Sequence, residues 1–148
     1  MGPLITPGRI RLQQEAVDWT QAVRDSAGLL LADGCITPGY VEAIFASFET
    51  NGDYMIVMPE VVLAHARPES GAVETAISLV TLRRPVLFRD DVTKPISVIF
   101  TLAAADASEH IKMMQHLAMT LVDSEASQTI KSSSDVDTIL GLLASTEN

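Results

Sequence analysis

The fold is decided by a run of nine uncharged residues, Ile96-Ser97-Val98-Ile99-Phe100-Thr101-Leu102-Ala103-Ala104. A nearly continuous apolar run of this length is typical of a central β-strand whose two faces are both covered by helices. The same apolar, β-branched character recurs in three other stretches, 54–58, 61–64 and 75–82. These four segments predict the core of a sheet.

Two weaker signals complete the predicted sheet. Residues 9–12 alternate basic and apolar side chains, which predicts a short strand with one buried face. The charged stretch 83–95 is predicted to be a connection, with a short strand at 86–88 inside it.

Helical patterns precede this block of strands. Residues 18–32 carry apolar side chains at three- and four-residue spacing. A second helix is predicted to begin at Thr37, because threonine favours the N-cap and Pro38 is tolerated in the first turn. The turn residues Asn51 and Gly52 are predicted to end it.

The last third of the chain is also predicted to be helical. Asp106 is a suitable N-cap, and Glu109 follows at the spacing of a capping box. The buried stripe of this helix is predicted to contain Ile111, Met114, Leu117, Ala118 and Leu121. A short helix is expected at 124–130, and Ser134 is expected to cap a final one. Helices before and after one block of strands indicate an α/β protein, a three-layer α/β/α sandwich with a mixed central sheet flanked by helices, built as a single domain over residues 1–148.

Composition excludes several classes of protein. The 148 residues carry a net charge of -9, and an acidic chain repels nucleic acid and anionic membrane surfaces. No uncharged run approaches the ~20 residues that cross a bilayer, and the first ten residues lack the pattern of a signal peptide. The single cysteine, Cys35, rules out an internal disulfide and is expected to be a small packed residue. These features predict a cytoplasmic protein.

The chemistry points to histidines. His65 follows the apolar run 61–64, so it is predicted to lie where a strand meets a loop, although a lone histidine there is more often structural. His110 falls near the start of the helix capped by Asp106, on the face that turns toward the sheet. His116 lies six residues later, about 240° around the helix, and is predicted to be a surface residue.

Two imidazoles placed in this way suit phosphoryl transfer. Neutral imidazole is nucleophilic, and its pKa near ~6.5 keeps a useful neutral fraction at cellular pH. A second imidazole can hydrogen-bond phosphate oxygens or fix the tautomer of the first. Arg67 lies two residues after His65, and guanidinium recognises phosphate oxygens well.

Two segments resemble a known family, namely Asn51-Gly52-Asp53-Tyr54-Met55-Ile56-Val57-Met58-Pro59 and Leu63-Ala64-His65-Ala66-Arg67-Pro68-Glu69. They are similar to the enzyme IIA components of the bacterial phosphoenolpyruvate-dependent sugar phosphotransferase system, within the mannitol/fructose-type superfamily and its ascorbate-type branch. Residues 78–82 and 103–107 match as well, so the resemblance covers nearly the whole chain.

The resemblance implies a phosphotransferase with an EIIA type-2 domain, a phosphohistidine intermediate and neither cofactor nor metal. His65 matches the phosphorylated histidine, which reacts through Nε2, and His110 matches the second active-site histidine. Arg67 matches the residue two positions after the nucleophile and is assigned to phosphate stabilisation. The implied donor is the histidine phosphocarrier protein. The implied acceptor is a cysteine of a IIB component, which phosphorylates sugar entering through the membrane component IIC.

The sequence departs from the family pattern at three positions. Glu60 stands where the family usually has glycine, Ala64 where it has proline, and Asp53 where the branch often has proline. The loss of that glycine and of the proline beside His65 predicts a changed backbone before the histidine. Glu60 is also expected to add a repelling charge near a bound phosphate.

Two other functions are compatible with part of the pattern. One is a regulatory protein of the same fold, whose phosphorylation state controls binding to a non-transport partner. The other is a metal-dependent hydrolase using His65, His110 and a carboxylate such as Asp106, although no ligand spacing typical of zinc sites supports it. The sugar itself is not encoded in this chain, since by the family's logic its choice belongs largely to the membrane component.

Overall fold

A computed structural model describes residues 4–144 of the chain. Its five strands form one mixed sheet in the order β1-β4-β5-β3-β2. Strand β5 lies in the middle, antiparallel to β4 and parallel to β3, while β1 is parallel to β4 and β2 is antiparallel to β3. The strands are β1 (Ile10–Gln14), β2 (Ile56–Met58), β3 (Glu60–Ala64), β4 (Ala76–Leu87) and β5 (Pro95–Ala103). The run that opens at Ile96 is therefore the central strand, as predicted.

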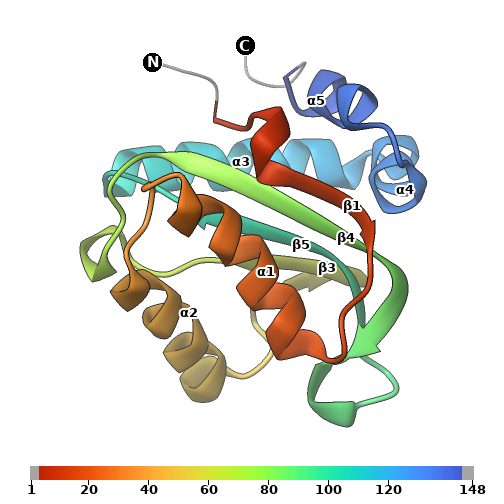
Figure 1. Cartoon of the computed structure of the whole chain (residues 1–148), viewed down its shortest axis with the longest axis horizontal. Coiled ribbons are helices and arrows are strands. Elements are labelled where there is room, and N and C mark those ends of the chain that lie inside the picture. Colours follow the sequence, from red (N-terminus) through yellow and green to blue (C-terminus); the bar gives the residue numbers. More distant parts are fainter. Residues whose placement is uncertain (1–3, 145–148) are drawn as a thin grey trace.

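The two faces of the sheet are covered by different helices (Figure 1). Along β5, Ile99 packs with the core beneath α1 and α2, while its neighbour Phe100 packs with the core beneath α3, α4 and α5. This alternation is the two-residue period of a strand with both faces buried. The helices are α1 (Trp19–Ala32), α2 (Pro38–Asn51), α3 (Ala107–Val122), α4 (Ser124–Ser132) and α5 (Val136–Ala144). The predicted three-layer α/β/α sandwich is confirmed.

The predicted connection at 83–95 is wrong for its first residues, whereas the short strand predicted at 86–88 is confirmed at Val86 and Leu87. Strand β4 continues to Leu87, and after an irregularity beyond Thr81 it pairs again with β5, Val86 opposite Ile96. The charged residues Arg83 and Arg84 are exposed, so this end of the strand tolerates them. The connection shortens to a turn that contains the 3-10 helix η3 (Phe88–Asp90).

Helix starts follow the predicted capping chemistry. The side chain of Thr37 accepts a hydrogen bond from the Tyr40 N–H, and that of Asp106 accepts one from the Glu109 N–H. Gly52 ends α2 with a φ of 66°, a left-handed value that glycine adopts without strain. The cap of α5 was wrongly assigned to Ser134. Instead, the carboxylate of Asp135 accepts a hydrogen bond from the Asp137 N–H, which satisfies one of the free N–H groups at the helix start.

The predicted buried stripe of α3 is partly wrong. Leu117 and Leu121 are buried as expected, but Ile111 is 57% exposed and Ala118 is exposed as well. Met113 and Thr120 take their places against the sheet. The buried face is rotated because Ile111, one turn into the helix, borders a pocket rather than the core.

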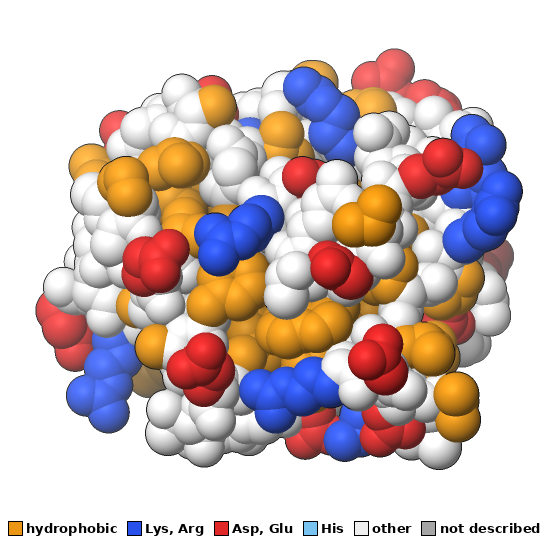
Figure 2. Space-filling model, turned by 60° about the horizontal axis from the view of Figure 1, so that its bottom comes forward, with side chains coloured by type: hydrophobic (Ala, Val, Ile, Leu, Met, Phe, Trp, Pro, Cys, Tyr) orange, Lys and Arg blue, Asp and Glu red, His pale blue; other side chains and the backbone are white. Residues whose placement is uncertain are grey.

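The outer surface carries both charges. Figure 2 shows one face of the molecule, on which acidic and basic side chains surround a central group of hydrophobic side chains. The net charge of -9 is therefore not gathered into one acidic patch on that face. No helix within residues 4–144 is both long and apolar enough to cross a bilayer.

A buried hydroxyl cluster connects α1 to the sheet, and its removal is a test of this packing. The Ser26 hydroxyl donates to the Ile99 carbonyl at 3.1 Å and accepts from the Thr101 hydroxyl at 2.8 Å. Ser26→Ala is expected to lower the free energy of unfolding by about 1–3 kcal/mol, because two buried polar groups lose a partner. Chemical denaturation measures this loss, and an unchanged midpoint would contradict the assigned role.

Candidate functional site

His65 lies immediately after β3, at the carboxyl end of this interior strand. Its Nδ1 is 2.8 Å from the carbonyl oxygen of Leu63. A carbonyl oxygen only accepts hydrogen bonds, so Nδ1 carries the proton and Nε2 keeps its lone pair. The backbone of β3 therefore fixes both the tautomer and the direction of the ring, and leaves Nε2 as the nucleophilic atom.

His110 approaches His65 from the first turn of α3. Its backbone N–H donates to the Asp106 carbonyl at 3.0 Å, and the two imidazole rings lie 5.2 Å apart between centroids, tilted by 55°. The sheet supplies one histidine and the helix start supplies the other. The structure thus brings together the two histidines that the sequence singled out.

The two rings share an open pocket. Arg67 also lines it, with an exposed side chain that makes no ion pair within the part of the chain that the structure describes. Tyr54, which the sequence reasoning did not single out, packs edge-on against His65 with 5.8 Å between ring centroids. The sequence signal that could have identified Tyr54 is its place in the segment 51–59, which resembles the family. The complete lining is Ser47, Asn51, Tyr54, His65, Ala66, Arg67, Pro68, Ala107, His110 and Ile111.

The surroundings of His65 favour its neutral form. Burial lowers the pKa of the His65 imidazole below its ordinary value of 6.5, because the charged form loses hydration. The neighbouring His110 lowers it further, while the hydrogen bond to Leu63 opposes both effects. At neutral pH the ring is therefore uncharged and able to act as a nucleophile.

His116 is not the surface residue that was predicted. It is half-buried, and its Nε2 is buried without a hydrogen-bond partner among the described residues. The reason is its place beside the buried stripe, since Met113 and Thr120 lie three residues before and four after it.

The structure shows how the chain accommodates two of the three departures from the family pattern, Glu60 and Asp53. Glu60 has a φ of 72°, a left-handed conformation, so this position retains the geometry that glycine favours. Its carboxylate accepts a hydrogen bond from Ser97 at 2.9 Å and pairs with Lys131 at 3.5 Å. Glu60 begins β3 and His65 follows its end, so the charge lies one strand length from the site, and the expected repulsion of a phosphate there is wrong. Asp53 is likewise paired, with Lys94.

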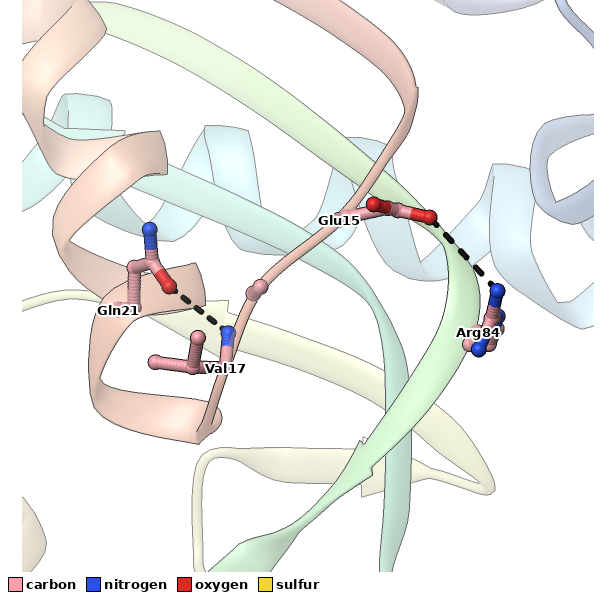
Figure 3. Close-up of a pocket in the computed structure, with 5 residues that line it drawn as sticks. Glu15, Val17, Gln21 and Arg84 are labelled. Carbon is pink, nitrogen blue, oxygen red and sulfur yellow. Dashed lines mark hydrogen bonds and ion pairs between the residues drawn. The ribbon is translucent and has the colours of Figure 1, made fainter.

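Other parts of the molecule offer weaker candidates for a functional site than the pocket around His65. Cys35 is fully buried as predicted, and burial raises the pKa of its thiol. A second hollow near the end of β1 is lined by Glu15, Ala16, Val17, Gln21 and Arg84, whose polar groups interact with one another (Figure 3). There the Val17 N–H donates to Gln21 at 2.8 Å and Arg84 lies 3.9 Å from Glu15. Within residues 4–144 no group of three His, Cys, Asp or Glu side chains could hold a metal ion.

Solved structures define the class of protein to which this fold belongs. The chain superposes on the mannitol-specific cryptic phosphotransferase enzyme IIA CmtB of Escherichia coli with a TM-score of 0.86 and 32% identity, covering 96% of each chain. It also shares its fold with enzyme IIAMTL of Escherichia coli, solved in complex with phosphorylated enzyme IIBMTL, with a TM-score of 0.84, 20% identity and coverage of 95% and 97%. The fold is that of the phosphotransferase IIA domains.

Sequence comparison narrows the class to a family. Residues 3–146 match the family "Phosphoenolpyruvate-dependent sugar phosphotransferase system, EIIA 2". The ascorbate-specific PTS system EIIA component of Salmonella typhi is 38% identical over 117 residues, 79% of this chain and 76% of the relative. That of Escherichia coli K12 is 41% identical over 101 residues, 68% of this chain and 66% of the relative. The chain belongs to this EIIA family and is a component of a sugar phosphotransferase system.

The environment of His65 predicts a measurable titration. By NMR the His65 ring is expected to titrate below pH 6.5, and His110→Gln is expected to raise that pKa by removing a neighbouring ionisable ring. The unfolded chain then binds this proton more readily than the folded one. The resulting stability is complete above about pH 6.5 and declines as the pH falls toward the folded-state pKa. A His65 pKa at or above 6.5 would contradict the described burial.

Proposed function

We propose that this chain is a phosphocarrier, which accepts a phosphoryl group on Nε2 of His65 and passes it to a partner protein. The observation that carries the proposal is the hydrogen bond from Nδ1 to the Leu63 carbonyl. It leaves Nε2 with the lone pair of a neutral ring, and His65 lines one pocket together with His110 and Arg67. Membership of the EIIA family supports the same role.

The transfer needs few groups. In the first step the Nε2 lone pair attacks phosphorus, the N–P bond to the donor's histidine breaks, and the donor ring keeps the electron pair. In the second step a cysteine thiolate of the acceptor attacks phosphorus, an S–P bond forms, and the electrons of the N–P bond return to Nε2 of His65. Throughout both steps the proton stays on Nδ1 and is donated to the Leu63 carbonyl, so His65 requires no tautomer change between the steps.

The neighbours of His65 supply charge stabilisation. Phosphoryl transfer spreads negative charge over three oxygens, and catalysis depends mainly on positioning and on groups that stabilise this charge. His110, whose ring lies 5.2 Å from that of His65, can donate a hydrogen bond to these oxygens. The guanidinium of Arg67, which makes no ion pair among residues 4–144, brings a positive charge to the same pocket. Both roles rest on geometry and on the family match.

The proposed partners follow from the family. The donor is the histidine phosphocarrier protein, and the acceptor is a IIB component that phosphorylates sugar entering through a membrane IIC. A IIA of the same fold has been solved with its phosphorylated IIB, which supports this type of acceptor. The ascorbate-specific relatives favour ascorbate, or a similar polyhydroxylated compound, as the transported substrate.

The proposal is tested by intact-mass measurement after incubation with phosphoenolpyruvate, enzyme I and the histidine phosphocarrier protein. The wild type is expected to gain one acid-labile phosphoryl group. His65→Ala is expected to gain none, because it lacks the nucleophile. His110→Ala and Arg67→Ala are expected to be modified at rates lower by roughly 10- to 100-fold, since each loses a charge-stabilising group.

The third histidine offers the matched control. His116→Gln removes an imidazole outside the pocket, so its rate of phosphorylation is expected to equal that of the wild type. An adduct that persists in His65→Ala would refute the assigned nucleophile. A wild-type protein that gains no phosphoryl group would refute the carrier role and favour a protein of this fold that only binds its partner.

A further inference from the structure

The Tyr40 hydroxyl makes an unusual set of contacts beside the site. Tyr40 is in the first turn of α2, and its side chain is completely buried. The hydroxyl donates to the Leu102 carbonyl at 2.7 Å and accepts from the Ala66 N–H at 3.1 Å, and it also lies 3.1 Å from the Ala66 carbonyl oxygen. Ala66 directly follows His65, and Leu102 is close to the end of β5. One phenol therefore joins a helix, a strand end and the peptide next to the nucleophile.

This hydroxyl is suited to a fixed position. Burial raises the pKa of Tyr40 above its ordinary value of 10.0, so the phenol stays protonated and able to donate. All three of its partner atoms belong to the backbone, which cannot rotate away as side chains can. Loss of the hydroxyl would leave the Ala66 N–H and the Leu102 carbonyl buried without this partner.

The first turn of α2 holds the same loop at a second point. The N–H of Thr37 donates to the Gly71 carbonyl at 3.0 Å, and its hydroxyl donates to the same oxygen at 3.1 Å. Gly71 has a φ of 135°, and a Cβ at this position would overlap the Thr37 hydroxyl. Residues 66–71, which include Arg67, are thus held at both ends by one helix turn.

We propose that Tyr40 is a positioning residue for phosphoryl transfer at His65. It does not line the pocket, so it acts through the backbone rather than on the phosphoryl group. The Ala66 peptide is held by Tyr40 on one side of His65, and strand β3 holds the chain on the other. Both restraints are needed to maintain the hydrogen bond from Nδ1 of His65 to the Leu63 carbonyl and to keep Arg67 beside the pocket. The proposal rests on the phosphocarrier function proposed above.

The test removes one oxygen atom, in Tyr40→Phe. The expected result is a phosphorylation rate lower by roughly 10- to 100-fold, because small displacements of a reacting group are costly. On the unphosphorylated protein, ¹⁵N NMR is expected to show a mixture of His65 tautomers and a His65 pKa closer to 6.5 than in the wild type. The NMR readout requires no phosphoryl donor, so it tests positioning even if the carrier function fails.

A matched control separates positioning from loss of stability. Ser26→Ala also removes a buried hydroxyl that bonds to β5, but from α1, away from the pocket. It is expected to destabilise the fold while leaving the tautomer, the pKa and the rate at wild-type values. If Tyr40→Phe is less stable but keeps the wild-type tautomer, pKa and rate, Tyr40 is merely structural and the proposal is overturned. If Ser26→Ala shows the same changes as Tyr40→Phe, the effect is global and the proposal is likewise overturned.

Discussion

The phosphoryl transfer proposed for this protein depends on one hydrogen bond, from Nδ1 of His65 to the carbonyl oxygen of Leu63. A free histidine exchanges its proton between two nitrogens, and only one tautomer leaves Nε2 with a lone pair. Here the choice is made by the backbone of a buried strand, which is far stiffer than a side-chain partner. Because β3 is paired on both sides, with β2 and β5, the Leu63 carbonyl has a fixed position and so restrains the orientation of the His65 ring.

The rest of the site is arranged around that fixed ring. The start of α3 brings His110 beside it, and the loop after β3 brings Arg67 to the same pocket. The first turn of α2 secures this loop through Tyr40 and Thr37. Three elements from different parts of the chain thus converge at the carboxyl end of β3, around a pocket that is open to a partner protein. The proposed carrier role needs this openness, since the phosphoryl group would enter from one protein and leave to another.

Much of this arrangement could be predicted from the sequence, because its signals are local. The uncharged run at 96–104 identified the central strand, and the residues Thr37 and Asp106 located two helix starts. His65 and His110 were paired correctly because each has a clear place in its element. The contacts of Tyr40 could not be predicted, since a phenol on a helix gives no sign of which distant backbone groups it will meet.

The errors have the same physical origin. Ile111 was assigned to the core because its spacing is helical, but its exposure is set by a pocket formed with residues distant in sequence. His116 was assigned to the surface from its angle to His110, although the buried face of α3 is rotated toward it. At Glu60 the sequence lacks the glycine of the family, yet the backbone keeps a positive φ and the carboxylate finds partners in Ser97 and Lys131. The periodicity of apolar residues describes a single helix or strand, whereas the burial and the partners of these side chains depend on how the helices and strands pack together.

We propose that the backbone of β3 selects Nε2 of His65 as the phosphorylated atom. Long-range ¹H–¹⁵N NMR of the histidine-labelled protein, recorded before and after phosphorylation, can identify the atom that carries the phosphoryl group. We expect a proton on Nδ1 in both states and the phosphoryl group on Nε2 of His65. A phosphoryl group on Nδ1 of His65, or on His110, would contradict it.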